Sequence, residues 1–180
     1  MTFISRSAMA NAQPLYLMTK PPLERAREID RRRRLLGLET RYGLERFHTT
    51  LLPLGDGRDI SCEYLDLLHR ALSSLCAEPF PIAFDKLNRN ALVGTKMREL
   101  RAFQRRLVRC LIAFGIPIPA YRFAPHLSLA YGATPDRRIA IPPINWLVEE
   151  YLLIRSIHGE GRHEVLDRWP LIERQGAFDF

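Results

Sequence analysis

The order of strand-like and helix-like segments restricts the fold of this chain more than any other sequence feature. The predicted helices carry apolar residues at helical spacing and span 23–36, 60–76 and 96–114. The predicted strands are apolar runs bounded by turn residues, at 15–18, 44–54 and 122–131, in a hairpin over 81–93, and in a pair at 144–157 and 164–172. Because helices alternate with hairpins and no linker rich in Gly, Ser or Pro divides them, we expect an α+β protein with largely antiparallel sheets.

Length and composition indicate one folded domain. The chain has 180 residues, of which 47% are hydrophobic, and this is enough apolar surface to offset the entropy lost on folding. We expect the domain to span residues 14–180 and to follow a flexible leader at 1–13. That leader contains one Arg and no extended apolar core, so it does not resemble a secretory signal, and no apolar run reaches membrane-spanning length. We therefore expect a cytoplasmic protein.

The charge balance favours an anionic partner. Lys and Arg number 27 against 20 for Asp and Glu, a formal net charge of +7, and the excess is nearly all arginine. The densest basic run, Arg31–Arg34, lies in the first predicted helix and is either a solvated helix face or an RNA-contacting patch. The cysteines form no close pair and are expected to be small buried hydrophobic residues: Cys62, Cys76 and Cys110.

Two short segments, 47–51 and 125–129, share one pattern: a histidine, any residue, a hydroxyl residue and Leu. Each lies in a predicted strand, where alternate side chains share a face, so His48 lies beside Thr50 and His126 beside Ser128. Hydroxyls can donate hydrogen bonds to phosphate oxygens, while a neutral imidazole accepts a proton and a protonated one donates it. The pattern therefore suits a phosphodiester and needs no metal; the alternative is two unrelated strand histidines.

Other candidate sites are weaker. His158 and His163 flank the turn at 159–161, and an exposed turn explains them better than a metal site, which would need a third ligand. His69 is expected on the polar side of a helix. No Cys has a His at motif-like spacing, and the glycines at 55–57 lack the Lys-Ser/Thr that follows in a phosphate-binding P-loop. An ATP-dependent ligase is therefore disfavoured.

The repeated element resembles the two motifs of the two-histidine (2H) phosphoesterases, in particular the LigT-like branch of 2′-5′ RNA ligases and RNA 2′,3′-cyclic phosphodiesterases. The first motif continues to Leu54-Gly55, the second includes Pro125, and 153–156 with 165–171 resembles the closing strand pair. The resemblance covers about 14–172, although only the two motifs are specific. It implies a bilobal, pseudo-symmetric fold with antiparallel sheets flanking a central cleft, helices outside, and one histidine from each lobe.

The resemblance also implies metal-independent opening of a 2′,3′-cyclic phosphate on RNA ends or nucleotides, usually leaving a 2′-phosphate. The implied catalytic set is His48, Thr50, His126 and Ser128, with His48 as general acid to the leaving oxygen and His126 as general base to water. The family frequently has an Arg near the position of Tyr131. That tyrosine either stacks on a base or packs as a strand-end aromatic, and the arginines that could replace the missing charge are Arg122, Arg137, Arg138 and Arg155.

Two other functions stay open. One is a binding module that recognises RNA or nucleotides through its arginines and has lost turnover. The other is a 2H enzyme that acts on 2′-5′ linkages or an ADP-ribose cyclic phosphate. The two intact motifs favour the cyclic phosphodiesterase. For that enzyme we expect RNA or a nucleotide with a cyclic phosphate as partner, no cofactor or metal, no membrane, no obligate protein partner, and a monomer.

Overall fold

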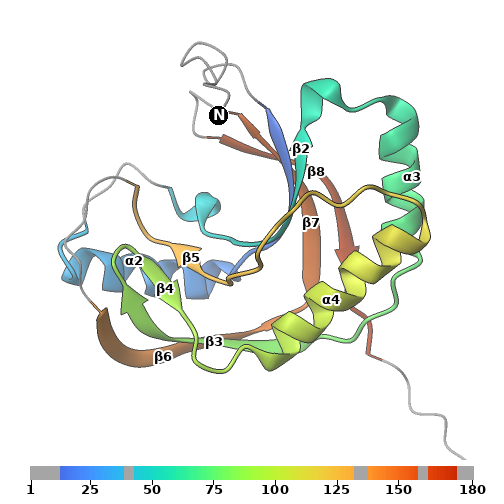
Figure 1. Cartoon of the computed structure of the whole chain (residues 1–180). Coiled ribbons are helices and arrows are strands. Elements are labelled where there is room, and N and C mark those ends of the chain that lie inside the picture. The colour runs from blue at the N-terminus through green and yellow to red at the C-terminus, as the bar shows by residue number, and fades with distance from the viewer. Residues whose placement is uncertain (1–12, 39–42, 132–137, 158–161, 174–180) are drawn as a thin grey trace, which may run out of the picture.

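Eight strands are described within residues 13–38, 43–131, 138–157 and 162–173 of the computed structural model, and they form two antiparallel sheets (Figure 1). The first sheet has the order β2-β1-β7-β8 and contains β1 (Pro14–Thr19), β2 (Thr49–Asp56), β7 (Glu150–Ile157) and β8 (Arg162–Pro170). The second has the order β5-β4-β3-β6 and contains β3 (Phe80–Asn88), β4 (Ala91–Val93), β5 (Leu127–Ser128) and β6 (Arg138–Val148). The predicted α+β class is confirmed.

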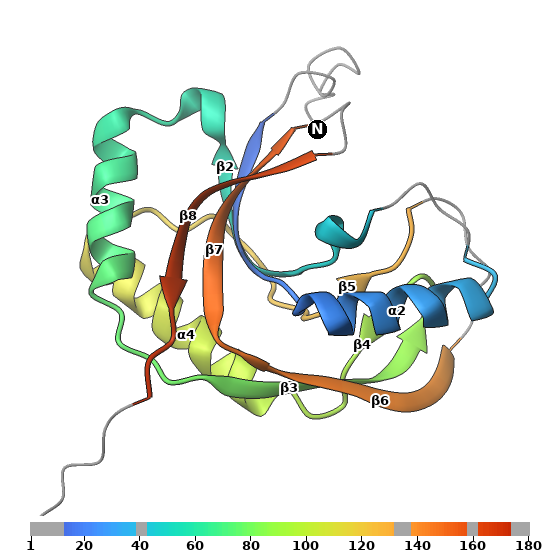
Figure 2. The same ribbon diagram turned by 180° about the vertical axis from the view of Figure 1, so that it is seen from behind.

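The three predicted helices are confirmed as α2 (Leu23–Leu35), α3 (Cys62–Ser73) and α4 (Arg98–Ala113). Helices α3 and α4 pack against each other beside the first sheet, whereas α2 lies along the second sheet near β6 (Figures 1 and 2). Two short 3-10 turns, η1 (Leu44–Arg46) and η2 (Gly57–Asp59), flank β2. None of the described helices is long and apolar enough to cross a membrane.

One hydrophobic core joins the two sheets and all three helices. In the first sheet the strand alternation divides the side chains of β1 between two faces. Leu15 and Leu17 point into the main core, while Tyr16 and Met18 pack on the other face with residues of β7. The first sheet therefore has one face against the main core and a second face, which is defined by Tyr16 and Met18.

The predicted strand at 144–157 is wrong in one respect, because it is two strands that belong to different sheets. β6 pairs with β3, β7 pairs with β1 and β8, and the change of sheet occurs at Glu149. Alternate burial continues to Val148, and two consecutive polar residues, Glu149 and Glu150, then break it. This break in the period-2 pattern is the sequence signal for the bend between the lobes.

The two motif strands are shorter than predicted. η1 occupies the start of the 44–54 run, so β2 begins only at Thr49, and within 122–131 only Leu127–Ser128 pairs as a strand. Each motif histidine therefore lies just before its strand. The cysteine prediction is also wrong: Cys62 and Cys76, at the start of α3 and just beyond its end, are exposed, and Cys110 is half-buried. The predicted leader, apart from residue 13, lies outside the described residues.

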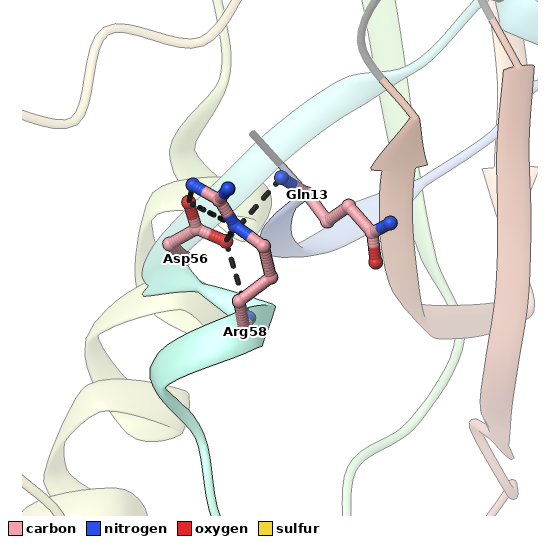
Figure 3. Close-up of polar contacts among 3 residues, drawn as sticks. All are labelled: Gln13, Asp56 and Arg58. Carbon is pink, nitrogen blue, oxygen red and sulfur yellow. Dashed lines mark hydrogen bonds and ion pairs between the residues drawn. The ribbon is translucent and has the colours of Figure 1, made fainter. Parts of the chain in front are cut away.

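Asp56 closes the end of β1 and β2 that lies away from His48. Figure 3 shows its contacts with Gln13 and Arg58. Its carboxylate accepts hydrogen bonds from the backbone N–H of Gln13 at 3.3 Å and of Arg58 at 3.1 Å, and it forms an ion pair with the Arg58 guanidinium at 2.6 Å. These bonds hold the pKa of Asp56 well below its ordinary value, the side-chain bond from Arg58 being the largest cause. The start of β1 and the end of β2 are thereby joined.

Candidate active site

The first motif is anchored by Phe47, whose ring is fully buried between η1 and β2. The next residue, His48, is half-buried, and its Nδ1 lies 2.7 Å from the carbonyl oxygen of Arg46. Thr50 is half-buried and pairs with Met18 of β1. Paired residues of an antiparallel ladder share a face, so Thr50 lies with Met18 on the second face of the first sheet.

The second motif is held by buried residues on either side of its histidine, Pro125 and Leu127. His126 itself is exposed, and its Nδ1 lies 2.8 Å from the carbonyl oxygen of Ala124. Ser128 is half-buried and pairs with Ala91 of β4.

Asn90, in the turn between β3 and β4, secures the end of the second motif. Its backbone carbonyl accepts a hydrogen bond from the N–H of Leu129 at 2.8 Å, and its side-chain amide donates to the carbonyl of Ala130. The predicted hairpin turn around this residue is confirmed, since β3 pairs with β4 on either side of it. The second motif is thus tied to the hairpin of the second sheet.

Both motif histidines make the same local hydrogen bond, from Nδ1 to the carbonyl two residues earlier. A carbonyl oxygen only accepts, so each Nδ1 carries the hydrogen and donates. In the neutral form of either ring the lone pair is then on Nε2. The two motifs, although contributed by different sheets, present chemically equivalent imidazoles, each able to accept or return a proton at Nε2.

Positive groups surround His48. Lys20 follows β1 and donates from Nζ to the carbonyl of Glu45 at 2.6 Å, and Arg46 precedes the motif. The pKa of His48 is lowered to about 4, chiefly by burial; the bond to the Arg46 carbonyl raises it, and the charges of Lys20, His126 and Arg46 add to the lowering. The effect of His126 shows that the structure brings the two motif histidines within electrostatic reach. Sequence reasoning missed both Lys20 and Arg46.

A third histidine lies beside the first motif. The ring centroid of His163 is 5.0 Å from that of His48, and the ring planes are inclined by 73°. His163 belongs to β8 and pairs with Ser156, so it is part of a strand and not of an exposed turn. His158, the other histidine of the weak metal hypothesis, lies outside the described residues. Within the described ranges, no group of three His, Cys, Asp or Glu is arranged to hold a metal ion.

Of the three candidate substrate-binding residues, Tyr131 lies beside the first motif, whereas Arg155 lies on the other face of the first sheet. Tyr131 is 63% exposed, and the guanidinium carbon of Arg46 lies 5.8 Å from its ring centroid, so it borders both motifs. Arg122 is exposed on the segment before the second motif. Arg155 pairs with Leu15, which points into the main core, and forms an ion pair with Glu164 at 3.4 Å. The register therefore puts Arg155 on the face opposite to His163.

Of the two remaining arginine candidates, the structure describes only one. Arg138 is exposed at the start of β6, where it pairs with Asn88. Arg137 lies outside the described residues. None of the three described arginines forms a hydrogen bond or ion pair with a motif histidine.

The basic run Arg31–Arg34 is not a uniformly solvated face. Arg33 is only 4% exposed, and its guanidinium lies 5.2 Å from the centre of the Phe47 ring. It donates to the carbonyl of Leu129 at 3.4 Å and forms an ion pair with Asp30. From one position on α2 it thus contacts the residue before His48 and the residue after Ser128. Arg31 and Arg34 are exposed, as predicted for a solvated face.

Solved structures share this fold. E. coli LigT complexed with 3′-AMP is 21% identical, with a TM-score of 0.71 over 90% of this chain and 99% of LigT. Its apo form also has a TM-score of 0.71, over 91% and 99%. TT0787 of Thermus thermophilus is 20% identical, with a TM-score of 0.64 over 88% and 97%. At these identities the similarity establishes the two-lobe fold that the resemblance implied. No curated protein matches the chain.

The sequence also matches a protein family directly. Residues 21–160 match the family described as the 2′-5′ RNA ligase superfamily, and this range contains both histidine motifs and most of the two sheets. The resemblance drawn from the two motifs is confirmed at the level of the family. With the motif geometry, the LigT fold and this match together, the chain belongs to the 2′-5′ RNA ligase superfamily and is a LigT-like protein.

Proposed function

We propose that this protein hydrolyses 2′,3′-cyclic phosphodiesters on RNA ends or nucleotides without a metal ion and leaves 2′-phosphates. The observation that carries the proposal is the pairing of two imidazoles from different sheets, each with Nδ1 bound to its own backbone and Nε2 left for proton transfer. The positive charges of Lys20 and Arg46 beside His48 suit a phosphate. E. coli LigT, which has the same fold, has been crystallised with 3′-AMP, ATP and phosphate.

In the proposed reaction a neutral imidazole takes a proton from water while the water oxygen bonds to phosphorus. The bond between phosphorus and the ribose 3′ oxygen breaks, and the second imidazole, protonated, gives its proton to that oxygen. A 3′-hydroxyl and a 2′-phosphate result. Thr50 and Ser128 donate hydrogen bonds to the non-bridging oxygens, where negative charge grows in the transition state.

The resemblance assigns His48 as the acid and His126 as the base, and the electrostatics put a condition on that assignment. Burial and the neighbouring charges keep His48 neutral in the free protein at pH 7, because its pKa is lowered to about 4. A neutral imidazole is ready to act as a base. To act as the acid, His48 must gain its proton when the negative phosphate arrives beside it.

The first test is hydrolysis of 2′,3′-cyclic AMP and of a short RNA ending in a 2′,3′-cyclic phosphate, with EDTA present. We expect turnover by the wild type and a loss of at least about 10²-fold in kcat for His48→Ala and for His126→Ala. His69→Ala is the matched control, because His69 is exposed on α3 and hydrogen-bonds to Asp167 away from both motifs. Strict dependence on a divalent cation, or equal rates for motif and control variants, would contradict the proposal.

A second test separates acid from base. A nucleoside phosphodiester with a p-nitrophenolate leaving group needs no general acid, because that phenolate leaves without a proton. The variant that has lost the acid should keep most of its rate on this substrate, and the variant that has lost the base should not. Survival of His48→Ala would support the assignment by resemblance. Survival of His126→Ala would exchange the two roles.

A further inference from the structure

The two motif histidines make the same kind of local hydrogen bond, but they lie in different environments. His126 is exposed, whereas His48 is half-buried and has a second imidazole, His163, against its ring. The centroid distance of 5.0 Å and the 73° angle put the edge of one ring against the face of the other, which is the favoured geometry of an aromatic pair. The structure thus gives the first motif histidine a neighbour that distinguishes it from the second.

The contact of β8 with η1 brings His163 to the first motif, and the register gives the face of the sheet on which it lies. β8 runs antiparallel to β7, and the pairs Ile154–Val165 and Ser156–His163 share a face two residues apart. Ile154 packs with Tyr16 and Met18, which define the second face of the first sheet, and Thr50 pairs with Met18 on that same face. His163 and Thr50 therefore lie on one face of the first sheet, at opposite edges of it.

The protonation state of His163 follows from its surroundings. Its Nδ1 is buried, and no described residue hydrogen-bonds to it. A buried N–H without an acceptor is costly, so Nδ1 carries the lone pair and Nε2 carries the hydrogen. The cationic groups that act on His163 are Lys20 and Arg46, and a charged His48 would add to them. Burial and these charges lower the pKa of His163 to about 3, so at pH 7 it is a neutral packing ring.

We propose that His163 is a positioning residue for His48. Its ring fixes the plane of the His48 imidazole from one side, while the bond from Nδ1 to the Arg46 carbonyl fixes it from the other, so that Nε2 holds one direction. A ring held at two points loses less rotational freedom when it reacts, and a misplaced catalytic group loses rate steeply. This role rests on the proposed function, in which His48 transfers a proton.

Two substitutions separate ring packing from nitrogen chemistry. His163→Ala removes the ring, so His48 can rotate and is more hydrated. We expect its kcat on 2′,3′-cyclic AMP to fall by about 10- to 100-fold with KM unchanged, and the His48 pKa, followed by NMR, to rise toward its ordinary value. His163→Phe keeps an aromatic ring there, so kcat should stay within about threefold of wild type and the His48 pKa should stay low. His69→Phe is the matched control on α3.

The outcomes decide the proposal even if a variant folds poorly. Unchanged kcat and unchanged His48 titration in folded His163→Ala would overturn it. A raised KM with unchanged kcat would also overturn it, because His163 would then contact substrate and not His48. If His163→Ala does not fold, loss of kcat in folded His163→Phe would overturn the packing role. If the wild type does not turn over cyclic phosphates, the proposed function fails, and the NMR titration of His48 in wild type and variants still decides whether His163 positions it.

Discussion

Arg33 is a buried arginine whose position makes it a link between the two motifs. Its guanidinium lies over Phe47 and donates to the Leu129 carbonyl, so it supports the first motif from one side and the second from the other. We expect Arg33→Met to fill the same space but to lose these contacts, with a loss of about 1–3 kcal/mol in the free energy of unfolding and about tenfold in kcat. Urea unfolding and cyclic AMP kinetics measure both effects.

Arg31→Met is the matched control for that substitution, because Arg31 belongs to the same basic run and is exposed. It should change the free energy of unfolding by no more than about 0.5 kcal/mol. Equal effects of the two substitutions would show that Arg33 acts only through the net charge of α2. Loss of stability without loss of kcat would show that it supports the fold but not the motifs.

The lowered pKa of His48 predicts the shape of the pH profile. kcat/KM reports the ionisations of the free enzyme, and the lower of two catalytic ionisations forms the acidic limb whichever role its residue has. With the pKa of His48 lowered to about 4, we expect the acidic limb near pH 4, against about 6.5 for an ordinary imidazole. Rates measured from about pH 3.5 to 9 in a buffer of constant ionic strength check this, and a limb at about pH 6 or above would contradict it.

At the scale of the elements, Asp56 joins the start of β1 to the end of β2, and its contribution depends on pH. Its pKa is lowered in the folded state, so the carboxylate stabilises the fold above the unfolded pKa of about 3.9. That stabilisation is lost as the pH falls through the lower, folded-state value. We expect Asp56→Asn to lower the Tm at pH 7, and the difference from wild type to shrink progressively below about pH 4.

Thermal unfolding of Asp56→Asn between about pH 2 and 8 tests this prediction, with Asp66→Asn, an exposed carboxylate on α3, as the control. Activity at pH 7 should be unchanged in the folded variant, because Asp56 lies at the end of β2 away from His48. A Tm difference that persists unchanged at the acid end of this range would mean that the carboxylate charge is not what stabilises this end of the sheet.

Elements with a strong local pattern could be predicted from sequence, and long-range placement could not. The three helices carry apolar residues at helical spacing, and the structure agrees within a few residues at each end. The sheet change at Glu149 has only a broken alternation as its signal. His163 reaches His48 because β8 contacts η1, a long-range contact that no local pattern reveals. Lys20 and Arg46 likewise join the site only through tertiary packing.

At the scale of the whole molecule, the site lies where the two lobes meet. The motifs come from different sheets, and the charges beside His48 come from the end of β1 and from η1. The four motif residues are a repeated local pattern, so the sequence alone could nominate them. Their surroundings are not repeated: one histidine is half-buried beside a third imidazole, and the other is exposed. A pseudo-symmetric fold thus presents two chemically similar groups in unequal environments, as acid and base roles require.

The net charge of +7 predicts that activity on RNA falls as the salt concentration rises. Each phosphate neutralised on a single strand adds about −0.7 to the slope of log affinity against log salt. If the basic surface contacts two RNA phosphates, raising salt from about 50 to 200 mM should lower kcat/KM for the RNA substrate by about five- to tenfold, against two- to threefold for 2′,3′-cyclic AMP. An RNA whose internal linkages are uncharged methylphosphonates is the control and should behave like the nucleotide. Equal salt dependence for the charged RNA and the nucleotide would mean that the protein holds only the terminal phosphate, and that its positive charge does not select RNA over a mononucleotide.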